Sequence, residues 1–136
     1  KKILEKFIIN GYQSSFLIGK TSIKDIECAK ALVDKNGYVR KTIDKRSIYK
    51  NELKKYRFIG EAIGVLKVSN KIRRLMIYGL KKFLQKKKNL ILNWEHFMNK
   101  FLETNKIMYN KTFNSQWIEI DTKKDYLKAV YLFKKK

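Results

Sequence analysis

The sequence predicts an α/β protein with a three-layer-type arrangement, in which a mixed β-sheet is flanked by helices. Segments with strand character alternate along the chain with segments of helical periodicity, which is typical of layered α/β proteins. Two extended runs are joined around Asn36-Gly37, the strongest short-range signal for an antiparallel hairpin. The sheet should therefore contain antiparallel as well as parallel pairs. The 136 residues, 44% of them hydrophobic, are enough for one domain with a buried core.

The first half of the chain is predicted to be mostly extended. Apolar residues at helical spacing indicate one short helix near the start. The expected elements are a helix over 3–8 that ends at Asn10-Gly11, strands over 15–19, 27–34 and 38–45, and a polar loop with a helical turn over 46–55. Cys28 falls in an apolar strand and is expected to be a small buried hydrophobe.

The second half is predicted to alternate strands and helices. The expected elements are a buried strand over 58–69, a helix that starts at Ser69 or Asn70, a helix over 93–104 capped by Asn93, strands over 106–112 and 117–120, and a last helix after Thr122. Asp125 follows Thr122 by three positions, which is a capping-box-like pattern. Gly60 and Gly64 interrupt the strand over 58–69, and they predict close approach by backbone or by a ligand.

Composition excludes several kinds of site. Cys28 is the only cysteine and His96 the only histidine, so the chain offers neither a disulfide framework nor a zinc site built on cysteines or several histidines. A chain without disulfides is expected in a reducing cytoplasm. No run approaches about 18 apolar residues, so no segment is predicted to span a membrane.

The net charge of +21, from 33 basic and 12 acidic residues, raises the possibility of a nucleic-acid partner. Only five of the 33 basic residues are Arg, the residue best suited to bidentate phosphate and base recognition. The richness in Lys, Ile and Asn is also what A/T-rich coding produces. A basic nucleic-acid-binding module therefore remains an alternative function, as does a scaffold whose strands pair with another chain.

Four segments occur in an order that resembles a known family. They are NGYVRKTIDK, FIGEAIGVLKVS, NWEHFMNKFLE and WIEIDTKKDYLKA. From about residue 16 onward, the chain resembles the C-terminal half of the nucleotidylyltransferases that activate a sugar-1-phosphate or phosphocholine with an NTP. The family's glycine-rich G-x-G-x-R loop, its P-x-x-K motif and its first metal-binding Asp are absent. The resemblance thus implies one domain over 1–136, the substrate- and metal-binding half of a Rossmann-like nucleotidyltransferase domain, inactive alone.

The resemblance also implies residue roles. Lys45 would contact phosphates, with Lys41 as the alternative if the register differs, while Gly60 and Glu61 would meet the substrate. Trp94 and Glu95 would line a site that suits a quaternary ammonium group, and Asp121 would bind Mg²⁺, with Glu119 on the same strand face. The residues alone leave other interpretations open: a solvated Lys45, an ion-paired Glu61, a core Trp94, and Asp121 as an acid beside a helix cap.

The partners implied are an NTP and a phosphorylated small molecule, with no membrane and with nucleic acid disfavoured. The chain would also form a homodimer or pair with the missing N-terminal half.

Overall fold

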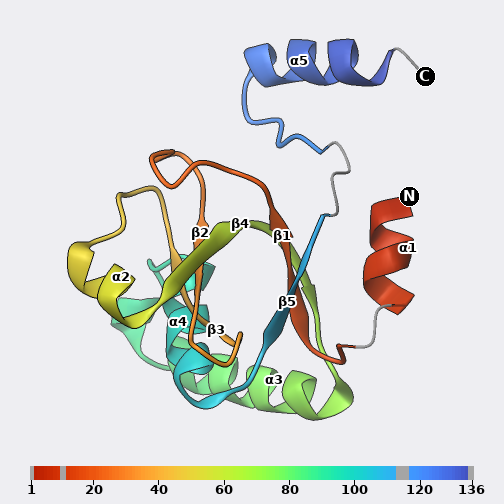
Figure 1. Cartoon of the computed structure of the whole chain (residues 1–136). Helices are drawn as coiled ribbons and strands as arrows, with labels where there is room; N and C mark the ends of the chain where they lie inside the picture. The colour runs from red at the N-terminus through yellow and green to blue at the C-terminus, as the bar shows by residue number, and fades with distance from the viewer. Residues whose placement is uncertain (1, 10–11, 113–116, 135–136) are drawn as a thin grey trace.

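The computed structural model describes residues 2–9, 12–112 and 117–134, which form a mixed sheet flanked by helices (Figure 1). The strands are β1 (Ser15–Gly19), β2 (Lys30–Val33), β3 (Val39–Ile43), β4 (Arg57–Lys67) and β5 (Met108–Lys111). The helices are α1 (Lys2–Ile9), α2 (Lys50–Lys55), α3 (Asn70–Leu84), the 3-10 turn η1 (Lys87–Asn89), α4 (Trp94–Thr104) and α5 (Lys123–Phe133). The α/β class predicted from the sequence is confirmed.

The sheet is built around the long strand β4, which pairs with two neighbours. Its strand order is β3-β2-β4-β1-β5; β1 and β5 run parallel, and the other neighbouring pairs are antiparallel. The sheet curls so that its two edges meet, because the backbone N–H of Val39 in β3 donates to the Ile107 carbonyl, just before β5, at 2.8 Å. This curl brings β3 and the start of β5 together, although they lie far apart in the sequence.

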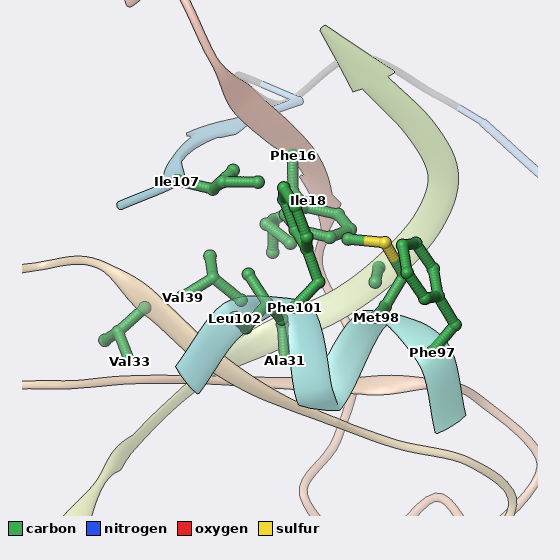
Figure 2. Close-up of a cluster of buried hydrophobic side chains, with 11 residues drawn as sticks. Phe16, Ile18, Ala31, Val33, Val39, Phe97, Met98, Phe101, Leu102 and Ile107 are labelled. Carbon is green, nitrogen blue, oxygen red and sulfur yellow. The ribbon is translucent and has the colours of Figure 1, made fainter. Parts of the chain in front are cut away.

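The hydrophobic core lies between α4 and one face of the sheet (Figure 2). Helix α4 buries Phe97, Met98, Phe101 and Leu102, which share one side of the helix because residues three and four apart lie on the same face. They pack on Ile107, just before β5, and on the sheet residues Phe16, Ile18, Ala31, Val33, Val39 and Ala62. Helix α4 is thereby fixed across the strands.

Helix α4 is also tied to the edge strand β3 by a side chain. The Asn99 carboxamide accepts from the Thr42 backbone N–H at 2.7 Å and donates to the Thr42 carbonyl at 2.8 Å. The amide therefore satisfies both backbone groups of Thr42, as a neighbouring strand would.

Two of the three helices predicted to begin at side-chain caps do so; Asn93 occupies the cap position of α4 without capping it. The Ser69 hydroxyl accepts from the Ile72 backbone N–H at the start of α3. Thr122 and Asp125 form the reciprocal capping box at the start of α5, which satisfies two of the backbone donors that a helix start leaves unpaired. In Figure 1, α3 and α5 lie at opposite ends of the molecule.

One predicted strand is wrong. Residues 117–120 are not a strand, although their apolar spacing suggested one. Trp117 instead lies against Gly19 of β1, because a Cβ atom on Gly19 would come within 2.2 Å of the indole ring. The missing side chain of Gly19 makes room for this ring, so the apolar residue serves packing, not strand pairing. The predicted helix end at Asn10-Gly11 lies outside the described residues.

Candidate functional site

Two buried charged residues lie side by side in the middle of the sheet. Lys30 of β2 and Glu61 of β4 are direct cross-strand partners, so their side chains share one face. Lys30 is 0% exposed, and its Nζ atom donates to the Arg46 carbonyl at 3.0 Å and to the Cys28 carbonyl at 3.4 Å. Those two bonds satisfy a buried ammonium that would otherwise be costly.

Glu61 is 8% exposed and has no hydrogen-bond partner among the residues that the structure describes. Burial, with the negative charges of Glu119 and Asp25, raises the pKa of Glu61 to about 7, although the positive charge of Lys30 opposes the rise. A carboxyl group that changes protonation near neutral pH and lacks a partner suits ligand binding.

The backbone beside Glu61 is unusually close to the next strand. Gly60 has φ +137°, and a Cβ atom there would lie 2.2 Å from the Gly19 carbonyl oxygen. This is an approach by backbone, one of the two alternatives that the sequence left open. Gly64 differs, since its φ is +75° and a Cβ atom there would meet nothing within 4 Å. Only glycine adopts both conformations without strain.

A cleft of about 970 Å³ opens beside this contact, along β1 and β5. Gly19 and Gly60 form part of its wall, and Lys20 and Lys111 contribute cationic groups. Asn110 also lines the cleft, and its buried Oδ1 atom has no hydrogen-bond partner within the described part of the chain. The cleft thus places two lysines near Gly60, on the strand that also carries Glu61.

Lys45 lies in the bend after β3, exposed and with φ +35°, a left-handed conformation that is uncommon for a residue with a side chain. The bend is held on both sides of Lys45. The Asp44 carboxylate accepts from Asn93 Nδ2 at 2.7 Å, and the Arg46 carbonyl accepts from Lys30. Hydrogen bonds therefore hold both chain neighbours of Lys45, and one of them, Arg46, contacts Lys30.

The start of α4 lies beside the same bend. Trp94 is 44% exposed, and its ring centroid lies 6.5 Å from that of Phe16. One side of the ring therefore packs on the core, and the rest is open to solvent. Glu95 is buried; its burial raises its pKa, and the charge of Asp44 adds to the effect. Asn93 occupies the predicted cap position, but its side chain bonds to Asp44 and His96 and caps no backbone N–H.

The two carboxylates of the terminal segment, Glu119 and Asp121, are both exposed. Asp121 lies in the bend before α5. The charge of Glu119 raises the pKa of Glu61. Among the described residues, no group of three or more His, Cys, Asp or Glu is spaced to hold a metal ion.

Sequence reasoning did not find Lys30. It stands in an apolar run, and only the cross-strand register places it opposite Glu61. The sequence signal that could have indicated a buried functional lysine is its isolated position between two alanines of a predicted strand. Lys41, the alternative to Lys45, has a structural role: its Nζ atom forms an ion pair with Glu52 at 2.6 Å.

Comparison with solved structures supports the fold. The structure is similar to that of a Bacillus anthracis protein assigned as a glucose-1-phosphate thymidylyltransferase, solved in complex with a sucrose. The TM-score is 0.61 at 16% sequence identity, over 99% of this chain and 49% of that chain. No family model matches the sequence, and no curated protein matches it. The likeness shows a fold shared with this nucleotidyltransferase, of which the chain spans about half the length.

Proposed function

We propose that this chain is the acceptor-binding part of a nucleotidylyltransferase. The reaction would move a nucleoside monophosphate from an NTP to a sugar-1-phosphate or phosphocholine-like acceptor and release pyrophosphate. The observation that carries the proposal is the buried Glu61, which lies opposite Lys30 and has no hydrogen-bond partner among the described residues. It lies on the strand that the four-segment resemblance assigns to the substrate, in a fold similar to that of a thymidylyltransferase.

The proposed roles follow from charge and position. Glu61 accepts a hydrogen bond from an acceptor hydroxyl or faces its cationic group, with the Gly60 backbone beside it. Trp94 and Glu95 would contact a cationic group of the acceptor, because an aromatic ring beside an acid suits an ammonium group. Lys45 meets the phosphates. Because phosphoryl transfer accumulates negative charge on phosphate oxygens, a positioned ammonium there stabilises the transition state.

Mg²⁺ is proposed as the cofactor, with Asp121 as its protein ligand. Protein-bound Mg²⁺ commonly uses one or two carboxylates and completes its shell with waters and substrate phosphates, so a single Asp fits. When bound, the ion would neutralise phosphate charge. Lys45 would share that task, while Glu61 would orient the acceptor.

The test has a binding arm and a turnover arm. In the first, glucose 1-phosphate and phosphocholine are titrated into the chain and followed by NMR. Glu61→Gln should lower the affinity for the acceptor by about tenfold, which is the effect of losing one hydrogen bond to a charged group. The matched control is Glu5→Gln, a change on the exposed face of α1.

In the turnover arm, pyrophosphate release is measured with the protein in its full natural length, over a panel of NTPs with Mg²⁺. The proposal expects release that depends on an acceptor and falls in Asp121→Ala. Absence of release with every NTP and acceptor pair contradicts the proposed reaction. Full activity in Asp121→Ala removes the metal role alone.

A further inference from the structure

The side of the molecule that carries α3 is strongly basic. Residues 70–89, which cover α3 and η1, contain eight Lys and Arg and no Asp or Glu, and all eight are exposed. Helix α3 turns only part of its surface inward, through Ile72, Met76 and Phe83. Its remaining surface offers positive charge to the solvent, with no acidic side chain in residues 70–89 to neutralise it, and such a surface attracts polyanions.

An exposed aliphatic turn follows this basic stretch directly. Leu90, Ile91 and Leu92 are 62%, 89% and 37% exposed. The turn is anchored, because the buried Asn89 donates from Nδ2 to the Phe83 carbonyl at 2.6 Å. Three consecutive aliphatic side chains are thus held in water next to the lysines of residues 86–88, an arrangement that costs solubility unless something covers them.

A groove of about 390 Å³ runs between α3 and α4 beside the same turn. Phe83, Phe97 and Phe101 contribute aromatic side chains to its lining, and Lys82, Lys86 and Lys100 contribute ammonium groups. Such a lining matches an amphiphile, whose apolar part contacts the rings while its anionic head meets the lysines. The groove, the turn and the basic helix therefore favour the same kind of partner.

We propose that this surface docks on an anionic lipid membrane, with residues 90–92 entering the headgroup region and the lysines of residues 86–88 meeting lipid phosphates. The aliphatic turn decides between polyanions, because a nucleic acid offers it no apolar phase, whereas a bilayer does. The sequence-based expectation of no membrane partner rests on the lack of a spanning segment. No described helix is long and apolar enough to cross a bilayer, but docking on the surface requires no span.

The test is co-sedimentation with vesicles of phosphatidylcholine alone and with about 30% phosphatidylglycerol, at about 0.1 M salt. Binding should need the anionic lipid and weaken as salt rises. Replacing Lys86, Lys87 and Lys88 with Gln should lower affinity by on the order of 100-fold, since each lysine near an anionic surface contributes about fivefold. Ile91→Ser should lower it by roughly three- to tenfold through lost apolar burial.

Helix α2 supplies matched controls. Changing Lys50, Lys54 and Lys55 to Gln removes the same charge at exposed positions, and Leu53→Ser removes an aliphatic side chain that is 43% exposed. Both variants should bind vesicles within about twofold of the parent chain, since they lie outside the proposed surface. If the α2 variants lost as much vesicle affinity, the binding would depend on net charge alone, which contradicts the proposed surface. Equal binding to neutral vesicles, or binding to duplex DNA without binding to anionic vesicles, also overturns the proposal.

Discussion

A Cβ atom at position 60 would lie 2.2 Å from the carbonyl oxygen of Gly19, a separation that no real pair of these atoms tolerates. The same atom would lie 2.8 Å from Ile18 Cγ2, and the φ of +137° at Gly60 is strained for any other residue. Gly60→Ala should therefore destabilise the protein by about 3 kcal/mol, the sum of backbone strain and overpacking. Urea unfolding followed by circular dichroism measures the change.

Gly64→Ala is the matched control for that substitution. It also places a side chain at positive φ, +75°, but in open space. Only the conformational cost remains, about 1 kcal/mol. Equal losses in the two variants would mean that the contact with Gly19 contributes nothing beyond backbone strain.

The bond between Asn99 and Thr42 predicts a large effect from a small truncation. Thr42 is 1% exposed, so Asn99→Ala leaves its backbone N–H and carbonyl buried without partners. Stability should fall by about 2–3 kcal/mol, the cost of stranding buried polar groups. Asn51→Ala, at an exposed position of α2, should change it by less than about 0.5 kcal/mol. Thermal unfolding of both variants compares them directly.

Glu52 should give stability that is lost in acid. Hydrogen bonds from Arg46, with further help from Lys41, lower the pKa of Glu52 from 4.5 to about 2. A carboxyl group with a lowered folded-state pKa stabilises the protein above pH 4.5, and the stability disappears as the pH falls toward 2. Glu52→Gln should remove about 2 kcal/mol at pH 7 and little at pH 2, as read from urea unfolding at each pH. A pH-independent loss would contradict the assigned ion pair.

Glu61 should have the opposite pH dependence. Burial raises its pKa from 4.5 to about 7, so the folded protein favours the neutral form and stability falls as the pH rises from 4.5 through 7. Glu61→Gln resembles the neutral form and should be more stable than the parent by about 2 kcal/mol at pH 8, but equal at pH 4. Denaturant unfolding at the two pH values tests this. A destabilised variant at pH 8 would instead indicate that the ionised carboxylate is well satisfied.

Local signals in the sequence were enough for most of the elements. The hairpin formed because Gly37 supplies a φ of +81° at the turn, and the last helix begins at Thr122 because its cap involves residues three apart. Such features depend on neighbours in the chain, which a sequence displays directly.

The features that the sequence did not predict depend on contacts between residues far apart in the chain. Residues 117–120 have strand-like spacing, but the Trp117 ring packs against Gly19. No local sequence pattern reveals this contact. The importance of Lys30 similarly depends on strand register, which places it opposite Glu61. The roles of Lys45 and Asp121 stay predictions, because they depend on where phosphates and Mg²⁺ bind.

The bonds from Asn99 and Ile107 also bear on self-association. Strand β3 ends the sheet on one side, and an end strand normally offers free N–H and carbonyl groups to other molecules. Here the N–H of Val39 and both backbone groups of Thr42 already have partners from within the chain. A second copy cannot extend the sheet along β3 without first detaching α4, so the molecule is protected from aggregating through that border.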